Sequence, residues 1–413
     1  MLDVEFAKQK VGSVLAQIQQ LKSSEFPYAE PDAALDLLRA IYEAELTRLN
    51  SIDATTDPRI RQQACAQANV QVATYYDVLG FILRSTNVRN AFETYDPLLA
   101  LCKRVYGSEA KLILSSEWAF SPFTYPAVVR DLPDLMFIGL PSTEASNSLI
   151  VPLAGHEIGH SVWRKPSRSP ALASLDRALQ DALTQNYHAN WPDFQRIFKV
   201  KDPKEDLLST LFLRGIWTQS YKLAARQTEE LFCDILGSRL FSEGFLYSFI
   251  YLISPNLGER PANYPSLSAR IKALSAASVA FGVPMPHNFA GYFSDPPKQL
   301  SQPEAFVLRM ADSASDQMIG DLVKAVKDIA PDGPYLPSDR ERDRILRHFC
   351  SLSPAMGAKS LGDIINAGWQ IRLDWTKWSQ FEFSPAVQDA VLNDLVFKTM
   401  EVMEFEARTA SNA

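Results

Sequence analysis

Two histidines one helical turn apart are the residues of this sequence best suited to chemistry. They stand in LIVPLAGHEIGHSVWR, where residues 155–160 read GHEIGH and supply His156, Glu157 and His160. Residues i and i+4 share one face of a helix, so both imidazoles can point at one metal ion. Zinc accepts imidazole nitrogens, and a neighbouring glutamate can take a proton from zinc-bound water. The pattern predicts His156 and His160 as zinc ligands and Glu157 as general base; the alternative is two packed histidines on a core helix.

A catalytic zinc site needs a third protein ligand, and the segment after His160 lacks the third histidine of the pattern HExxHxxGxxH. The best source is QTEELFCDILGSRLF, residues 227–241, where Glu230 and Asp234 are again one turn apart. Glu230 would bind zinc, and Asp234 would accept a hydrogen bond from the second nitrogen of a histidine ligand. Glu229 is a competing ligand, but its i+4 partner is Cys233, which leaves Asp234 without that orienting role. We therefore prefer Glu230.

Two glycines flank the histidine motif. Gly155 and Gly159 lie in a segment predicted to be helical, where glycine costs about 1 kcal/mol relative to alanine. Their presence predicts that another helix approaches closely, and the helix that carries Glu230 is the expected neighbour.

The surrounding elements predict a mostly helical α+β fold. Helical periodicity covers roughly 3–23, 31–50, 59–86 and 96–105, whereas 111–118 and 134–141 are short and β-favouring. Helices return at 148–165, 171–187, 204–213 and 217–242, and later at 304–329, 338–351, 360–374 and 385–408. We expect a zincin-like core with a small sheet between two helical flanks.

Loop-rich segments divide the chain into three expected units. A helical N-terminal unit covers 1–107, and a zincin-like core covers 108–292 with a helical insertion at about 166–215. A Pro-rich stretch at 283–303 precedes a helical C-terminal unit at 300–413.

Composition excludes some classes of binding partner and indicates where the protein is located. The chain has 413 residues and a net charge of −7, and no Lys/Arg run suited to phosphates, which argues against nucleic acid as a partner. Its most apolar run, 245–254, is half the length that a bilayer span needs, so no transmembrane segment is expected. Four scattered cysteines without a CxxC pair, and a start that does not resemble a secretory signal, indicate a cytoplasmic protein.

Three segments together resemble the gluzincin metallopeptidases with the pattern HExxH...ExxxD, most closely the CAAX prenyl proteases and the heat-shock protease HtpX. They are LIVPLAGHEIGH, EELFCDILG and NYPSLSARIKAL at 263–274, in the order that the family shows. The resemblance implies zinc as cofactor, His156, His160 and Glu230 as ligands, Glu157 as base and Asp234 as the residue that orients a ligand. It implies hydrolysis of peptide bonds, with a peptide or protein as substrate.

This sequence departs from the family at named positions. Cys233 replaces the alanine before the aspartate, and Tyr264-Pro265 replaces a His-Pro pair. Members of the family are commonly embedded in membranes, whereas no transmembrane segment is expected here. A prenylated membrane substrate is therefore not carried over to this chain. The resemblance covers about 134–275 and does not extend to either helical flank.

A further donor is needed for the negative charge that develops on the substrate carbonyl. Tyr264 ranks first because it takes the position of the family histidine and has a phenolic O–H. Arg270, Tyr247, Tyr251 and His287 in the loop MPHNF are also considered, with a surface-loop histidine as the ordinary interpretation of His287.

The expected function is that of a zinc metalloendopeptidase. Two alternatives remain open: a zinc hydrolase that acts on a non-peptide substrate, and a zinc-containing regulatory or binding protein with little turnover. The oligomeric state is not predicted.

Overall fold

The computed structural model describes residues 2–53, 55–86, 91–117, 123–124, 132, 134–165, 169–200, 207, 210–254, 260–295 and 299–411. Helices predominate in these ranges and the strands form one small sheet, which confirms the predicted α+β class with mostly helical content. The chain forms two compact units, of which the first comprises 1–95 with 109–146 and the second 96–108 with 147–413.

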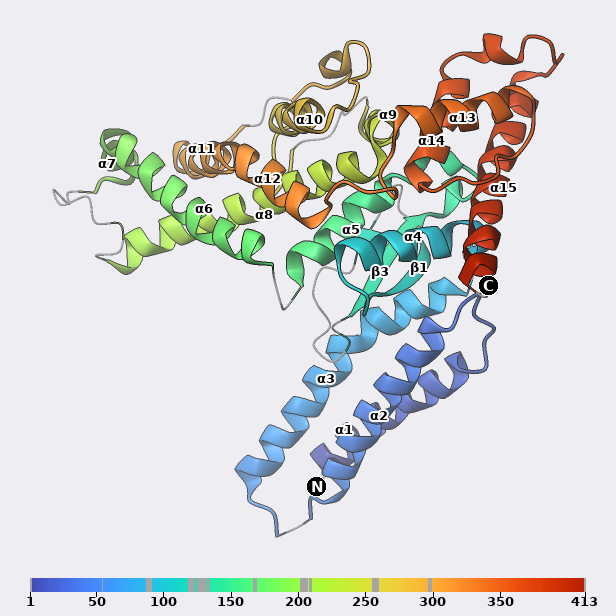
Figure 1. The fold of residues 1–413 in the computed structure, drawn as a ribbon. Helices are drawn as coiled ribbons and strands as arrows, with labels where there is room; N and C mark the ends of the chain where they lie inside the picture. The colour runs from blue at the N-terminus through green and yellow to red at the C-terminus, as the bar shows by residue number, and fades with distance from the viewer. Residues whose placement is uncertain are drawn as a thin grey trace. The chain divides into compact units, whose positions relative to one another are not determined.

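The first unit packs three long helices with the sheet. The helices are α1 (Leu2–Leu21), α2 (Glu30–Asn50) and α3 (Pro58–Ser85) (Figure 1). The sheet has the order β1-β3-β2, in which β1 (Lys111–Glu117) is parallel to β3 (Leu135–Pro141), and β2 (Phe123–Thr124) is antiparallel to β3. Ile113 of β1 pairs with Phe137 of β3, whose ring packs edge-on against Phe81 of α3 at a centroid distance of 5.4 Å. The buried core of this unit therefore joins sheet and helices.

The second unit is built around α8 (Leu211–Phe241), the long yellow-green helix of Figure 1. Every residue from Gln227 to Phe241 is buried, because α5, α6, α10, α11, α12 and α14 pack against α8 from several sides. Thr210 caps its start by accepting the N–H of Leu213. The helices of this unit, besides the end of α4 (Ala91–Val105), are α5 (Leu153–Arg164), α6 (Pro170–Ala189), α7 (Trp191–Phe198), α9 (Glu243–Ile253), α10 (Leu267–Phe281), α11 (Gln302–Gln317), α12 (Ile319–Ile329), α13 (Asp339–Cys350), α14 (Leu361–Arg372) and α15 (Pro385–Ser411).

Most expected elements appear with shifted ends, and some were not expected. The predicted helix at 304–329 is two helices, α11 and α12, which meet at Met318. Helices α7, α9 and α10 and strand β2 were not predicted. Half of the predicted helix at 204–213 lies outside the described residues, and 211–213 belong to α8.

The grouping of elements differs from the three units expected from the sequence. The strands belong with the N-terminal helices, while the helices near the C-terminus belong with α5 and α8. Helices α6 and α7 occupy the segment expected to hold a helical insertion.

Among the described residues, no helix combines the length and apolar character that a membrane span requires.

Asp363, in the first turn of α14, has a buried carboxyl group and lies far from the histidine motif in the sequence. Its side chain is 1% exposed, and Oδ1 accepts the N–H of Ser338 at 2.7 Å. Burial raises the pKa of Asp363 to about 7, although the hydrogen bond from Ser338 and the charges of Arg342 and Arg344 oppose the shift. The unfolded chain therefore loses this proton at a lower pH than the folded chain, so Asp363 reduces the free energy of unfolding as pH rises toward 7.

The variant Asp363→Asn removes this titration and keeps an amide oxygen for the N–H of Ser338. We expect its stability relative to wild type to increase between about pH 5 and pH 7, by at most about 1.4 kcal/mol per pH unit, and to level off above that range. Thermal unfolding followed by circular dichroism across this pH range measures the difference in Tm. A Tm difference that is the same at every pH contradicts the assignment.

Candidate metal centre

Helix α5 carries the histidine motif, and the residues before it are compatible with the start of a helix. Asn147 first caps a short 3-10 turn, Ser148–Ile150, by accepting the N–H of Leu149. Pro152 then stands just before the first helical residue, where its missing N–H costs nothing. The helix ends at Arg164, and Lys165 leaves the helical conformation.

Glycines bring α5 and α8 into close contact, as predicted. A Cβ atom on Gly159 would lie 2.8 Å from the Cα of Cys233 and 2.9 Å from its Sγ. A Cβ on Gly155 would lie 3.1 Å from the Cα of Gly237 and 3.0 Å from the ring of Phe241. Real Cβ contacts essentially never fall below 3.0 Å, so Gly159 at least is required for this approach. The motif therefore lies directly against the helix that carries Glu230 and Asp234.

The two histidines direct their Nε2 atoms toward one carboxylate. Glu230 Oε2 lies 3.2 Å from His156 Nε2, and Oε1 lies 3.6 Å from His160 Nε2. The Glu230 side chain is 1% exposed, and its Oε1 has no hydrogen-bond donor in suitable geometry among the described residues. Two imidazoles and a carboxylate thus converge in a buried place.

A different carboxylate holds the Nδ1 atom of each histidine. Asp234 Oδ1 lies 2.9 Å from Nδ1 of His156, and Glu229 Oε1 lies 2.8 Å from Nδ1 of His160. Because a carboxylate only accepts, each Nδ1 carries a proton and donates it. When a metal ion replaces any proton on Nε2, that nitrogen offers its lone pair to the metal.

Asp234 is fixed in turn by Arg270 of α10. The guanidinium donates from Nε to Oδ2 and from Nη2 to Oδ1, both at 2.7 Å. Burial alone would raise the pKa of Asp234, but the charge and hydrogen bonds of Arg270, with the bond to His156, lower it to about 2. Arg270 therefore orients Asp234. It is not free to bind a substrate carbonyl, which was the role considered for it from the sequence.

Two further arginines neutralise the carboxylates of Glu229 and Glu230. Arg164 Nε lies 2.6 Å from Glu229 Oε1, and Arg226 reaches Glu229 Oε2 and Glu230 Oε1, both at 2.7 Å. Burial opposes ionisation of Glu229, yet the hydrogen bond to His160 and the charges of His160 and both arginines lower its pKa to about 2. Burial likewise opposes ionisation of Glu230, but His156 lowers its pKa.

The acidic surroundings favour a cation between the two helices. Burial disfavours a charged imidazole at His156, but hydrogen bonds to Asp234 and Glu230 outweigh it and raise the pKa of His156 to about 10. Without a metal, His156 is protonated on both ring nitrogens, and each N–H donates to one of its two carboxylate partners. A metal ion can take the place of the proton on Nε2.

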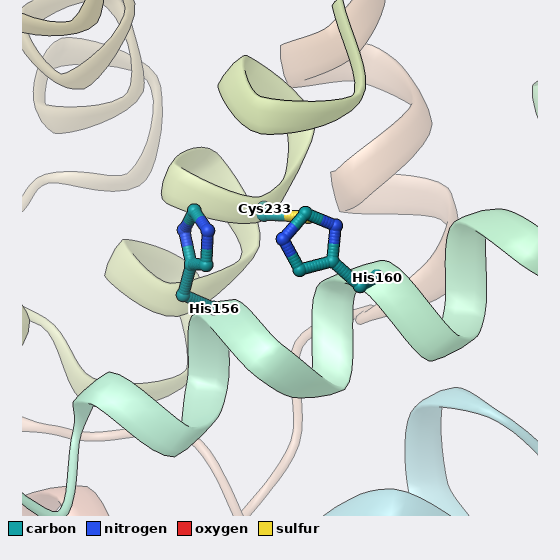
Figure 2. Close-up of side chains that lie close together, drawn as sticks. All are labelled: His156, His160 and Cys233. Atoms are coloured by element: carbon teal, nitrogen blue, oxygen red, sulfur yellow. The ribbon is translucent and has the colours of Figure 1, made fainter. Parts of the chain in front are cut away.

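Cys233 forms part of the same cluster. His156, His160 and Cys233 place ligand atoms within 4.8 Å of one another, so the three could hold a metal ion (Figure 2). Its sulfur lies 3.3 Å from His160 Nδ1, on the side of the ring that Glu229 occupies. Burial raises the pKa of Cys233 well above its usual value, so the thiol is neutral in the absence of metal.

The remaining predicted residues differ in their placement. Glu157 is buried on α5, and burial raises its pKa against the charges of His156 and His160. Tyr264 lies near the cluster, because its ring centre is 6.0 Å from Cζ of Arg226, and it is 37% exposed. His287 is exposed in a turn before Phe289–Tyr292, and no contact with the cluster is seen within the described ranges.

Sequence reasoning missed the partner of His160, the arginines Arg164 and Arg226, and the role of Arg270 in orienting Asp234. It treated Glu229 as a rival ligand, whereas Glu229 holds His160 as Asp234 holds His156. Two signals were present in the sequence: Arg226 precedes Glu229 and Glu230 by three and four residues, and Arg164 follows His160 by four. Both spacings place the charges on the same helix face.

No protein-family model, curated protein or solved structure matches this chain. The resemblance of the three sequence segments to gluzincin metallopeptidases therefore stays a prediction.

The variant Gly159→Ala tests whether the close helix contact builds the metal centre. Its Cβ would displace α8 at Cys233, and we expect a loss of about 1–3 kcal/mol in stability together with weaker metal binding. The matched control is Gly215→Ala on α8, whose Cβ would meet no atom within 4 Å. That control should gain up to about 1 kcal/mol from helix propensity and bind metal normally. Chemical unfolding and isothermal titration with Zn²⁺ measure both effects, and equal behaviour of the two variants contradicts this assignment.

Proposed function

We propose that this chain is a zinc-dependent metallopeptidase in which His156, His160 and Glu230 hold zinc and Glu157 is the general base. The observation that carries the proposal is the convergence of Glu230 on Nε2 of both histidines, while Asp234 and Glu229 hold the opposite nitrogens. Packed core histidines do not require two separate carboxylates on Nδ1 and a third between the Nε2 atoms.

The donor set fits zinc by chemistry and by spacing. Zinc binds two imidazoles and one carboxylate in many hydrolases and keeps a fourth position open. Bonds of about 2.0–2.1 Å at the tetrahedral angle separate neighbouring ligand atoms by roughly 3.3 Å. Glu230 Oε2 lies 3.2 Å from His156 Nε2, close to this value, and the other oxygen, Oε1, lies 3.6 Å from His160 Nε2. Oε1 is buried and makes no hydrogen bond with a described residue, although Arg226 lies 2.7 Å away.

Bound zinc would supply a Lewis acid that polarises water and the scissile carbonyl group. Glu157 follows His156 on α5 and has its carboxyl group in a dry environment, where it can accept a proton from the attacking water. The same carboxyl group can then deliver that proton to the amine nitrogen of the leaving peptide. Asp234 and Glu229 keep both imidazoles oriented during this transfer. Tyr264, exposed beside Arg226, is the donor we assign to the developing negative charge.

A peptide or protein is proposed as the substrate because the three sequence segments together resemble a peptidase family. Activation of water does not by itself select the bond that is cut, so a non-peptide substrate is an outcome of the same experiment. The cytoplasmic location stays a prediction.

The position of Cys233 favours one second candidate, a structural zinc site. If Cys233 joined the histidines and Glu230, four protein ligands would close the coordination shell, as in structural zinc sites. The neutral thiol and its position on the Nδ1 side of His160 favour the open site.

The variant Glu157→Gln separates the two candidates. It removes the base and leaves the ligands, so we expect one zinc per chain and a fall in peptide cleavage of about 10²- to 10⁴-fold. Metal analysis and mass spectrometry of a proteome-derived peptide library measure both. Zinc bound by the wild-type protein without cleavage of any peptide would contradict the peptidase and favour the other functions.

The third ligand is tested by three variants, of which the two Glu→Gln changes are nearly isosteric. Glu230→Gln should abolish stoichiometric zinc binding, because a neutral amide replaces the carboxylate that faces both histidines. Glu229→Gln should weaken zinc binding by about 10- to 100-fold, because it acts through the orientation of His160. Cys233→Ala should bind zinc as wild type does. Competition titrations with a chromophoric chelator measure the affinities, and a loss of zinc from Cys233→Ala with retention in Glu230→Gln would overturn the ligand set.

A further inference from the structure

A polar cavity lies where α8 and α10 end. Its volume is about 230 Å³, and it is also lined by the chain before α13, by the first turn of α13 and by Asn366 in the middle of α14. The lining residues used below are Arg239, Ser242, Phe281, Leu336, Arg342 and Asn366. All of them belong to the second compact unit, and none is part of the metal centre.

Asn366 presents an unused donor to this cavity. Its side chain is 2% exposed, and Oδ1 accepts the N–H of Gly244 at 2.7 Å. That bond fixes the amide plane and leaves Nδ2 with no hydrogen-bond partner among the described residues. The Nδ2 of this cavity-lining residue therefore keeps free capacity to donate, and an acceptor in the cavity can use it.

Arg239 presents a second donor. It is 8% exposed, donates from Nε to the carbonyl of Ala330 at 3.0 Å, and pairs through Nη2 with Asp332 at 2.6 Å. Nη1 makes no hydrogen bond with a described residue, and the guanidinium lies over the ring of Phe281 at 4.8 Å. Its plane is therefore fixed before any ligand arrives.

Arg342, the other cation of the cavity wall, is already neutralised. It pairs with Glu243 at 3.4 Å, with Asp339 at 2.8 Å and with Asp343 at 2.9 Å. Asp339 also lines the cavity, whereas Arg239 has one carboxylate partner, the exposed Asp332. A ligand therefore meets the remaining donors of Arg239 and Asn366 and not a broadly positive surface. This arrangement suits one small acceptor group better than a highly charged phosphate.

Ser242 adds a strained backbone at the same place. Its φ of +54° and ψ of −136° fall in a region that favours glycine, although the residue is serine. Ser242 lines the cavity, and its hydroxyl makes no hydrogen bond with a described residue. Strained backbone of this kind persists where the surroundings enforce it, and it is concentrated at binding sites.

We propose that this cavity binds a small carboxylate with an apolar body. The carboxylate oxygens accept from Arg239 Nη1, Asn366 Nδ2 and the Ser242 hydroxyl, because a planar guanidinium and a carboxylate match in geometry. The apolar body packs against Phe281, Leu336 and the neighbouring Val283.

This proposal does not depend on the proposed peptidase. Arg239 follows Asp234 by five residues on α8, so the cavity and the metal centre occupy different stretches of that helix. The variant Glu157→Gln should bind the carboxylate as wild type does, so failure of one proposal can be told from failure of the other.

Isothermal titration of the full-length protein with isovalerate tests the proposal, with isovaleramide as the uncharged control of the same shape. We expect saturable binding of one isovalerate per chain and at least tenfold weaker binding of isovaleramide. Asn366→Asp keeps the acceptor for Gly244 and replaces the Nδ2 donor by an oxygen, so it should weaken isovalerate binding at least tenfold. Ser242→Gly removes the hydroxyl and relieves the strained φ, so it should weaken binding several-fold while Tm stays equal or rises.

Three results would overturn the proposal. They are no saturable binding by the wild type, equal binding of acid and amide, and unchanged affinity in Ser242→Gly and Asn366→Asp. If Asn366→Asp fails to fold, Ser242→Gly and Arg239→Lys, which keeps the charge but loses the fork of Nη atoms, decide the question.

Discussion

The contact between α5 and α8 is the constraint on which the candidate site depends. At Gly159 and Cys233 the helices are closer than any side chain on α5 would permit. On α8, Gly237 lies against Gly155, and a Cβ on Gly237 would lie 2.4 Å from the ring of Phe245. The histidine side chains are short, so only this approach lets both reach carboxylates on the neighbouring helix. The close packing that the glycines allow offsets their poor helix propensity.

The same contact brings several charged side chains into a buried environment, where each charge needs a partner of opposite sign. Burial of an unpaired carboxylate would be very costly, and Asp234, Glu229 and Glu230 each have a cationic or histidine partner. Arg270 serves Asp234, while Arg164 and Arg226 serve Glu229. Glu230 has His156 at 3.2 Å from Oε2, but Arg226 lies 2.7 Å from Oε1 without forming a hydrogen bond. The carboxylate with the poorest partner is thus the one that faces both Nε2 atoms.

The local part of this arrangement could be predicted, and the long-range part could not. Helical spacing alone places His156 with His160 and Glu230 with Asp234, and the glycines indicate a close neighbour. The sequence does not give the rotation of α8 against α5, which decides that Glu229 meets Nδ1 of His160 while Glu230 meets Nε2. For the same reason the strands were expected beside the histidines, although they pack with the N-terminal helices. Helix α10, which supplies Arg270, was missed because only the family resemblance marked that segment.

Helix α8 is the element through which the second unit holds both polar sites in place. Its residues from Gln227 onward are buried on every face, so rotation or sliding would disrupt packing against several helices together. Gln227 adds polar restraint, since its amide binds Asp312 at 2.8 Å and its carbonyl accepts from Ser315 at 3.0 Å. Arg239 does the same near the C-terminal end through Ala330 and Asp332. A helix fixed at both ends of its buried half keeps Glu230 and Asp234 in register with α5, which is the preorganisation that a metal centre requires.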